Sequence, residues 1–399
     1  MRIGLFGISG VYNFGCEAIV RGATGLIRRL YPRADIKYFT HNYDYDCRIL
    51  SDLGIEIVKI EEKVNILNRA TSKLCRIIHT EHRPLFMNTE KILRQVDVIW
   101  SIGGDIYTIP EHRRRNPKYE YYNAIADFCD RAVEAGKNVI LYGASVGPFG
   151  EYDKAVSYYI KNLRQYKLIM CRELDTFSYL KQCSLQNIIF FPDPAFQVHG
   201  NSKEYKEKKY IGFNISPLSL KELYGEASIE NKKKIANLIE RIIDVFNISI
   251  LMIPHVVSKS ESDDDLRFQK QLVDIVDEEH RGRIYIADYS GGFLGLKSQI
   301  QQCKFVIAAR MHCAINALVE NVPAIMLSYS KKSVGMGQYI YNSNKWTLSL
   351  KDIDVGLIPL MCEMAGIEEE LSKYLNKRNS EINQEYERLI DTLKNRIGV

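Results

Sequence analysis

Short apolar runs alternate with longer amphipathic stretches along most of this chain. The short runs are rich in Val and Ile and predict buried strands, whereas the longer stretches repeat their apolar positions at helical spacing. Strands are predicted near 2–7, 35–39, 55–59, 96–102, 138–143, 167–170 and 187–191, and again near 210–215, 248–253, 283–286, 304–308 and 324–328. Helices are predicted between them, for example at 16–30, 119–136, 172–183, 229–245, 263–277 and 311–320.

The order of these elements predicts the fold class. Strands that alternate with helices form parallel sheets with crossover helices on both faces. A Pro-Asp-Pro sequence and the lysine-rich stretch 200–209 interrupt the alternation once. We therefore expect two doubly wound, Rossmann-like α/β domains, at 1–199 and 208–345. The charged, helical segment 346–399 is expected to pack back on the first domain. Ligands of such domains bind at the carboxyl ends of the strands.

The composition is that of a globular protein in a reducing compartment. Of 399 residues, 46% are hydrophobic and 26% are charged, which excludes a disordered chain. No apolar run approaches the roughly 20 residues of a membrane helix, and the N-terminus lacks the parts of a secretory signal. Nine cysteines without C-x-x-C spacing indicate reduced thiols and a cytoplasmic location. A net charge of +5 does not indicate nucleic acid, but it suits an anionic substrate.

Basic and apolar residues are interspersed in the segment 63–83. The residues concerned are Lys63, Arg69, Lys73, Arg76 and Arg83, with Ile66, Leu67, Leu74, Ile77 and Ile78. Together with the basic cluster Arg113–Arg115, they suit peripheral contact with the inner face of an anionic membrane. A solvated basic face is the alternative interpretation. Cys75, His79 and His82 have helix-like spacing but no fourth ligand, so no metal site is expected.

Three glycine-rich loops follow predicted strands of the first domain. The loop after the first strand precedes a helix N-terminus that can receive an anion, and Asn13 and Glu17 are its polar residues. It does not read G-x-G-x-x-G, which disfavours a nicotinamide dinucleotide. A second loop carries Gly104 and Asp105, and Asp105 suits sugar binding or general-base work, with helix capping as the alternative. The third loop carries Ser145.

Arg172 directly follows the strand predicted at 167–170. An arginine at a strand end can hold a carboxylate or a phosphate through two parallel hydrogen bonds. A surface ion pair with Glu173 or Asp175 is the alternative.

The second domain contains the stronger anion-binding signal. Arg310 and His312 open a helix directly after a buried strand. There the helix dipole, the guanidinium and a protonated imidazole would together attract an anion. Lys331 and Lys332 follow the next strand, and His255 ends the second strand of this domain, so both are expected at the same edge of the sheet.

Taken in order, these motifs resemble those of the polysaccharide pyruvyl transferases over roughly residues 1–340. The matching pieces are Tyr12–Glu17, Ser101–Asp105, Gly143–Pro148, Arg172-Glu173, Asp193–Phe196, Arg310–Leu318 and Tyr329–Lys332 with Gly335. Two positions depart from the family pattern: Cys16 stands where Asp is usual, and Met311 where Leu is usual. The resemblance implies a fold similar to that of two-domain GT-B glycosyltransferases, with the site in a cleft that the two domains face.

The resemblance also implies an activity and its partners. Such an enzyme moves pyruvate from phosphoenolpyruvate onto a sugar of a cell-surface polysaccharide precursor, forms a ketal and releases phosphate. We expect a lipid-linked sugar acceptor. Arg172 and His312 would contact phosphoenolpyruvate, assisted by Arg310 and a lysine of the pair 331–332. The expected substrate-binding residues are Arg172, Arg310, Lys331, Lys332, Asn13, Gly104, Ser145, His255 and Met311.

The implied chemistry needs an acid, a base and cationic side chains. Protonation of the methylene carbon makes a cation-like centre at C2, which one sugar hydroxyl attacks; phosphate leaves and a second hydroxyl closes the ketal. His312 is expected as the general acid, and Asp105 or Glu17 as the base. No cofactor and no metal are expected. Two alternatives remain: a GT-B glycosyltransferase that uses a sugar nucleotide, and a non-catalytic protein that binds a sugar phosphate or a nucleotide.

Overall fold

The chain forms two compact units in its computed structural model. The described residues are 1–63, 65–77, 80–109, 121–150, 153–200, 207–328 and 331–397, without the side chains of 66, 67 and 331–334. The first unit comprises Met1–Val11, Ile19–Pro194 and Tyr386–Val399, and the second unit comprises Tyr12–Ala18 and Ala195–Glu385.

The chain passes between the units at several points. It enters the second unit after Pro194, a few residues before the linker expected at 200–209. Of the segment 346–399, which was expected to pack back on the first domain, the residues up to Glu385 group with the second unit, and only Tyr386–Val399 groups with the first. The short loop Tyr12–Ala18 also groups with the second unit, although the residues on both sides of it belong to the first.

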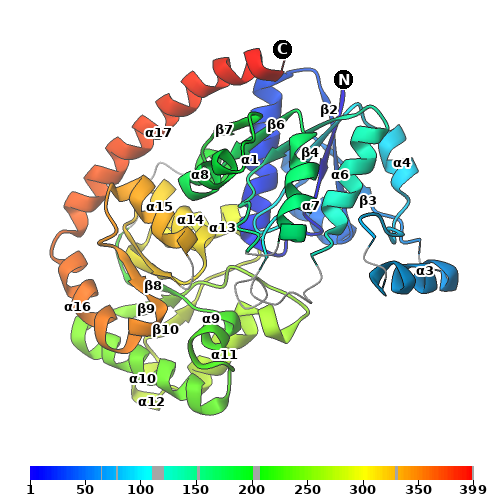
Figure 1. Cartoon of the computed structure of the whole chain (residues 1–399). Helices are drawn as coiled ribbons and strands as arrows, with labels where there is room; N and C mark the ends of the chain where they lie inside the picture. The colour runs from blue at the N-terminus through cyan, green and yellow to red at the C-terminus, as the bar shows by residue number, and fades with distance from the viewer. Residues whose placement is uncertain are drawn as a thin grey trace. The chain divides into compact units, whose positions relative to one another are not determined.

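The first unit is built on a seven-stranded parallel sheet in the order β3-β2-β1-β4-β5-β6-β7 (Figure 1). The strands are β1 (Arg2–Phe6), β2 (Asp35–Thr40), β3 (Glu56–Lys59), β4 (Val98–Ile102), β5 (Asn138–Tyr142), β6 (Leu168–Cys171) and β7 (Ile188–Phe190). In β1 and β4 every residue after the first is buried, as expected for parallel strands that are covered on both faces.

The helices of this sheet contribute the rest of its core. They are α1 (Phe14–Leu30), α2 (Tyr43–Ile49), α3 (Ile66–Ile77), α4 (Thr89–Arg94), α6 (Ala124–Glu134), α7 (Asp153–Arg164) and α8 (Leu174–Gln182). Aromatic pairs anchor them: the Phe6 ring of β1 stacks on Phe128 of α6 with centroids 3.8 Å apart. Phe149 stacks on Tyr159 of α7 with centroids 4.1 Å apart. Such offset pairs stabilise beyond the area that they bury.

The second unit repeats the architecture with a six-stranded parallel sheet in the order β10-β9-β8-β11-β12-β13. Its strands are β8 (Tyr210–Asn214), β9 (Ser249–Met252), β10 (Ile284–Ile286), β11 (Cys303–Ala308), β12 (Ala324–Ser328) and β13 (Thr347–Ser349). Its helices are α9 (Pro217–Tyr224), α10 (Ile229–Phe246), α11 (Asp265–Ile275), α12 (Glu278–Arg281), α13 (Gly292–Ile300), α14 (Met311–Val319), α15 (Lys331–Tyr341), α16 (Ile353–Ala365) and α17 (Glu368–Ile397).

The two parallel sheets confirm the predicted α/β fold class. Each strand predicted from the sequence is present to within a few residues. β13 is the addition: it has three residues, pairs with β12 and is too short to show an apolar pattern of its own. Within the described ranges, no helix has the length and apolar character needed to cross a membrane.

The strand order places the loops that matter for function. In each sheet the order reverses beside the first strand, between β1 and β4 and between β8 and β11. Loops that leave such neighbouring strands diverge, and open α/β sheets bind ligands at these switch points. Asp105 lies just after β4, and Arg310 and His312 lie just after β11. The candidate residues therefore stand where each sheet favours a ligand.

Candidate functional site

Arg172 is the centre of the polar cluster at the carboxyl edge of the first sheet. It follows β6, and its side chain is almost completely buried. Its Nη1 donates to Asp193 Oδ2 at 3.0 Å, and its Nη2 donates to Ser145 Oγ at 2.7 Å. Its Nε lies 3.3 Å from Glu173 Oε1, and its Nη2 lies 3.6 Å from Asp105 Oδ1. These partners come from the ends of β4, β5, β6 and β7, which are neighbours in the sheet.

Arg172 is surrounded by three carboxylates in the interior, whereas the alternative interpretation was a single ion pair on the surface. Burial lowers the pKa of the Arg172 guanidinium, but the surrounding carboxylates, Asp193 first, raise it above its ordinary value. The guanidinium therefore stays charged while three carboxylates surround it. The Arg172 side chain is only 1% exposed, so it does not lie on the surface. It acts first as the ion that holds four strand ends together.

Asp105 is the exposed member of this cluster. Its side chain is 63% exposed, whereas those of Asp193 and Glu173 are buried. Ser145 is buried as well: its N–H donates to Gly104 O at 2.8 Å, and its Oγ donates to Glu173 Oε1 at 2.6 Å. The loops that carry Gly104 and Ser145 are thus bonded to each other, and Asp105 stands at their edge with its carboxylate open to an approaching hydroxyl.

Arg310 has a similar environment in the second unit. It precedes α14, and its Nε and Nη2 donate to both oxygens of Asp265 at 2.7–3.0 Å. Its Nη2 also donates to Asp263 Oδ1 at 2.8 Å, and its backbone N–H donates to Asn214 Oδ1 at 2.9 Å. Burial lowers the pKa of Arg310, but Asp265 and then Asp263 raise it above its ordinary value. Nη1 takes no part in these bonds, so it is the nitrogen that can reach a ligand.

His312 lies where two helix N-termini meet. It is in the first turn of α14, and its ring packs against Gly15 in the first turn of α1. A Cβ placed on Gly15 would lie 2.6 Å from His312 Nδ1, so only glycine allows this approach. Helix N-termini present unpaired backbone N–H groups and a positive dipole, which favour an anion. At the start of α1 the N–H groups of Phe14, Gly15 and Cys16 already donate to His255 O, Asn13 Oδ1 and Asn13 O. The arrangement therefore combines an imidazole with the anion-attracting N-terminus of α14.

His255 is a buried neighbour of His312. It is 1% exposed, and its ring makes edge contacts with Phe14 and Phe293, both at 5.8 Å between centroids. Burial lowers the pKa of His255 well below its ordinary value, and the nearby charges of His312 and Arg310 lower it further. His255 is therefore neutral near pH 7. At 1% exposure, its side chain is covered by its neighbours.

Glu17 and Asn13 are held by helix ends. Glu17 Oε2 accepts from Phe293 N–H at 2.7 Å, so a carboxylate of α1 caps the N-terminus of α13. Gly292 makes room for it, since a Cβ there would lie 2.2 Å from Glu17 Oε2. Asn13 Oδ1 accepts from Gly15 N–H at 3.0 Å at the start of α1. Both side chains fix the loop Tyr12–Ala18 within the second unit.

The remaining expected residues are less informative. Met311 is half-buried and packs against the core of the second unit. Lys331 and Lys332 open α15, but their side chains lie outside the described residues, as do Tyr329 and Ser330. His79 and Arg113–Arg115 lie outside them too.

Two acidic residues of the site were not recognised from the sequence. Asp193 was noted only as part of the Asp193–Phe196 motif, yet it is the shortest carboxylate contact of Arg172. Asp265 stands in an acidic run at a helix start, where capping is the usual role, but Asp264 is the residue that accepts from Arg267 N–H, whereas Asp265 binds Arg310. The sequence offered one signal for both residues. Asp193 follows a strand and Asp265 starts a helix, and each is therefore placed at the sheet edge where an arginine also stands.

One group of described side chains has a geometry that could hold a cation. It consists of Glu240, Asp277 and His280, far along the chain from the candidate residues. Glu240 Oε1 accepts from Asp277 N–H at 2.9 Å, and His280 Nε2 lies 2.9 Å from Asp244 Oδ1. These bonds show that the three residues connect α10 to α12. We therefore do not treat them as a candidate metal site.

Structures with the same fold include nucleotide-sugar enzymes. The UDP-GlcNAc 2-epimerase of Neisseria meningitidis, bound to UDP-GlcNAc, matches with a TM-score of 0.59 and 10% identity over 98% of this chain and 99% of that one. Anabaena HepE, in complex with UDP and glucose, matches with a TM-score of 0.56 and 11% identity over 98% and 99%. The UDP-GlcNAc 2-epimerase of Methanocaldococcus jannaschii, in complex with UDP-GlcNAc and UDP, matches with a TM-score of 0.53 and 12% identity over 92% of this chain and 93% of that one.

At such identities these structures establish the fold alone, which is GT-B-like with two Rossmann-like domains. No curated protein sequence matches the chain significantly. The family model described as polysaccharide pyruvyl transferase matches residues 13–331, a range that contains the clusters around Arg172, Arg310 and His312. The chain therefore belongs to the polysaccharide pyruvyl transferase family.

Proposed function

We propose that the protein transfers pyruvate from phosphoenolpyruvate to a sugar of a cell-surface polysaccharide precursor, forms a ketal and releases inorganic phosphate. The family supports a pyruvyl transfer to a polysaccharide. The observation that carries the donor assignment is the position of His312 in the first turn of α14, beside Arg310. Phosphoenolpyruvate is a small dianion or trianion, which is the kind of ligand that a helix N-terminus favours.

In the proposed mechanism, His312 supplies the proton that starts the reaction. It protonates C3 of phosphoenolpyruvate, and the positive charge that develops at C2 is attacked by one hydroxyl of the sugar. The base takes the proton of this hydroxyl. The C2–O bond to phosphate then breaks, with its electron pair leaving on the phosphate, and a second hydroxyl attacks C2 to close the ketal and returns a proton to the His312 imidazole. The N-terminus of α14 and Nη1 of Arg310 stabilise the phosphate as it leaves. Lys331 and Lys332 are proposed to assist at the same edge.

Of the two residues proposed as the base, Asp105 is favoured. Its carboxylate is exposed, and it lies beside Arg172 at a sheet edge where a sugar can approach. The carboxylate of Glu17 is buried and already accepts the Phe293 N–H. A buried, bonded carboxylate cannot reach a hydroxyl proton without giving up the cap of α13. Arg172 is then proposed to orient Asp105 and to contact the donor carboxylate from the same cluster.

The remaining proposals concern cofactor, location and acceptor. We propose a reaction without cofactor or metal, in the cytoplasm, on an acceptor linked to lipid at the inner face of the membrane. Turnover should then be insensitive to EDTA. A sugar-nucleotide reaction is the competing function, because structures of the same fold contain UDP-sugars.

Incubation of the protein with phosphoenolpyruvate and a set of sugar acceptors tests the function. The expected result is phosphate release together with an acceptor whose mass rises by one pyruvate less one water. A parallel incubation with UDP-sugars should release no UDP. Release of UDP with a transferred hexose, and no phosphate from phosphoenolpyruvate, would overturn the proposal. Ligand binding without turnover on any acceptor would favour a non-catalytic binding protein.

A further inference from the structure

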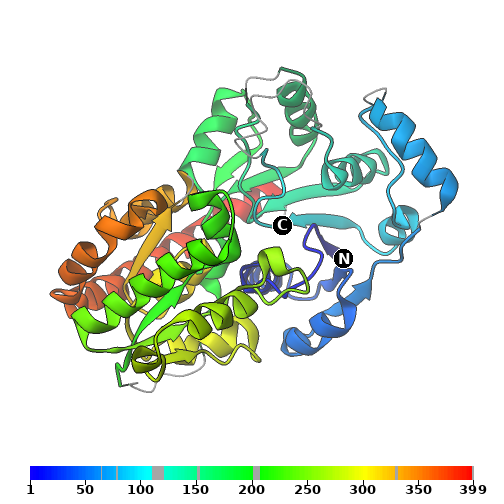
Figure 2. The same ribbon diagram turned by 90° about the horizontal axis from the view of Figure 1, so that it is seen from below.

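The helix α3 exposes an apolar stripe to solvent at the edge of the first unit. In both views it lies outside the helices that cover the sheet (Figures 1 and 2). Leu74 and Ile77 are 57% and 66% exposed, and Ala70 is exposed on the same side. With about 100° between successive residues, these three positions fall on one face of the helix. Exposed apolar side chains that line up in this way indicate a surface that binds something.

A basic stripe runs beside the apolar one. Arg69, Lys73 and Arg76 follow each other at spacings of four and three residues, so they also share a face, whose centre lies about a quarter-turn from the centre of the apolar stripe. These three side chains line a cavity of about 370 Å³. Its other walls include Arg83, Leu85, Phe86 and Tyr122. The cavity thus combines cationic side chains with an apolar rim.

The wall opposite α3 is held by a buried acid. Asp127 of α6 accepts from Arg83 N–H at 3.0 Å and from Tyr122 Oη at 2.7 Å. Arg131 Nη2 donates to Arg83 O at 2.8 Å, and the Arg83 guanidinium lies over the Tyr122 ring at 4.3 Å. The Arg83 side chain is therefore fixed at the cavity although it is buried and charged.

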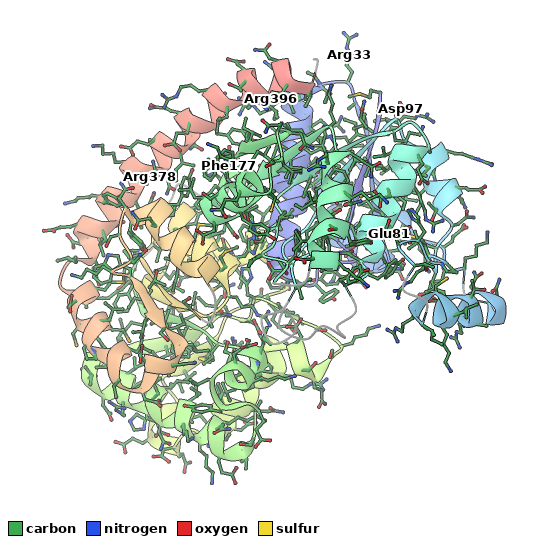
Figure 3. The ribbon with its side chains drawn as sticks, in the orientation of Figure 1. Arg33, Glu81, Asp97, Phe177, Arg378 and Arg396 are labelled. Carbon is green, nitrogen blue, oxygen red and sulfur yellow. The ribbon has the colours of Figure 1, made fainter. Side chains whose placement is uncertain are left out.

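The acidic residues nearby are occupied by other lysines. Glu81, which Figure 3 labels beyond the end of α3, accepts from Lys161 at 2.6 Å, and Glu61 pairs with Lys91. Arg69 and Lys73 make no ion pair in the described part of the chain. Arg69 and Lys73 are therefore cationic side chains of the cavity wall that can attract an anionic partner.

We propose that α3 and the segment Arg83–Phe86 form a docking site for an anionic membrane surface. Leu74 and Ile77 enter the boundary between headgroups and acyl chains, and Arg69, Lys73 and Arg76 bind lipid phosphates beside them. A helix with an apolar face flanked by cations binds membranes in this orientation. A nucleic acid would use the cations but would leave the exposed Leu74 and Ile77 unexplained. This inference does not depend on the proposed pyruvyl transfer.

Vesicle co-sedimentation of the full chain tests the inference. Vesicles of phosphatidylcholine alone should bind weakly, and vesicles that also contain phosphatidylglycerol should bind strongly and lose binding as salt is added. The variant Arg69→Ser/Lys73→Ser/Arg76→Ser should reduce binding on the order of 100-fold, because each cation near the surface contributes roughly a factor of five. Leu74→Ser/Ile77→Ser should reduce it by at least about tenfold.

A matched control uses exposed residues of the second unit. Val355 is 77% exposed and the Lys377 side chain is 81% exposed, so Val355→Ser/Lys377→Ser changes the same residue types elsewhere. The control should bind like the parent chain, and all variants should keep its Tm. Equal binding to both vesicle types, or unchanged binding by both α3 variants, overturns the proposal. Binding of inorganic pyrophosphate in solution without binding to vesicles overturns it too, in favour of a soluble phosphate ligand.

Discussion

Arg172 and Arg310 are strand-end arginines that carboxylates hold in place. Arg172 is buried and Arg310 is largely buried, each makes contacts with two or more acids, and each has its pKa raised by those acids against the effect of burial. The motif alone suggested arginines free to bind an anion. In the structure all three side-chain nitrogens of Arg172 donate to protein acceptors, whereas the bonds of Arg310 to Asp263 and Asp265 use Nε and Nη2 and leave Nη1 to a ligand. Such pre-ordering is what a site for a small anion needs.

Arg172 should therefore be important for stability as well as for binding. Arg172→Ala leaves Asp193 and Glu173 buried without their cation, so the free energy of unfolding should fall by about 3–5 kcal/mol. Arg172→Lys should recover only part of this loss, because an ammonium cannot reproduce the guanidinium contacts. Urea denaturation measures both. Arg94→Ala, at an 81% exposed side chain, should change stability by less than about 0.5 kcal/mol. If Arg172→Ala is as stable as the parent, the cluster is not a structural unit.

His312 should affect turnover more than binding. As the proposed general acid, its replacement by Ala or Gln should slow phosphate release by at least about 100-fold, while phosphoenolpyruvate still binds at the N-terminus of α14. Calorimetry for binding and a phosphate assay for turnover, on the same samples, separate the two effects. Near-normal turnover of a folded His312→Ala variant would rule out the acid role.

Gly15 tests the same site from the other helix. Gly15→Ala would place a Cβ 2.6 Å from His312 Nδ1, so the imidazole must move and turnover should fall at least about tenfold. Gly25→Ala, in the same helix with no atom within 4 Å of the added Cβ, is the matched control. It should leave turnover unchanged and raise stability by up to about 1 kcal/mol. Equal activities of the two variants would show that the position of the His312 ring does not matter.

At the scale of elements, helix ends organise the second unit. Asn13 caps α1, Glu17 caps α13, and Asp264 caps α11. The loop Tyr12–Phe14 also forms backbone bonds with the segment after β9: Phe14 N–H donates to His255 O at 3.0 Å, and Val257 N–H donates to Tyr12 O at 3.0 Å. The first turn of α1 is therefore a fixed part of the second unit, which explains how Gly15 comes to lie against α14.

Glu17 should be a structural residue at this scale. Glu17→Ala removes the acceptor of the Phe293 N–H and should lower the free energy of unfolding by about 1–3 kcal/mol. Glu17→Gln keeps an acceptor oxygen, so it should be more stable than Glu17→Ala and should retain turnover. Thermal unfolding and the phosphate assay measure the two properties. A Glu17→Gln variant that is stable but inactive would indicate that Glu17, and not Asp105, is the general base.

At the scale of the whole molecule, a buried ion pair joins α13 to the end of α14 and also binds Gly200, which lies between the two sheets in the sequence. Lys297 Nζ of α13 lies 3.0 Å from Glu320 Oε1, and Glu320 also accepts from Gly200 N–H at 3.0 Å. Burial lowers the pKa of Lys297 to about 8, although Glu320 raises it in part. Folding thus favours the neutral lysine relative to the unfolded chain.

This pair predicts a pH dependence of stability. Because the folded pKa of Lys297 is below its unfolded value, its contribution is fully present above the unfolded pKa and is lost as pH falls through about 8. The parent should gain stability relative to Lys297→Met/Glu320→Gln as pH rises from neutral to alkaline, by on the order of 1–3 kcal/mol. Urea titrations across that range measure the difference. The exposed pair Lys345–Glu363, changed in the same way, should show no such trend, and an identical trend for both pairs would refute the assignment.

Much of this protein could be predicted from its sequence by itself. Apolar periodicity located the strands and most helices, and the alternation of strand and helix determined the parallel sheets, because both signals are local. It follows that Asp105, Arg172 and His312 lie at strand ends, where ligands bind. β13 was not predicted, because three residues are too few to show a repeating apolar pattern.

Only the tertiary structure decided which side chains meet. Asp193 reaches Arg172, and Asp265 reaches Arg310, because strands distant in sequence are neighbours in the sheet. Glu17 caps a helix 276 residues away. No local pattern encodes such pairs, because they depend on strand order and on how each helix packs. The sequence therefore determined where charged residues stand, and the fold decided which of them are already paired.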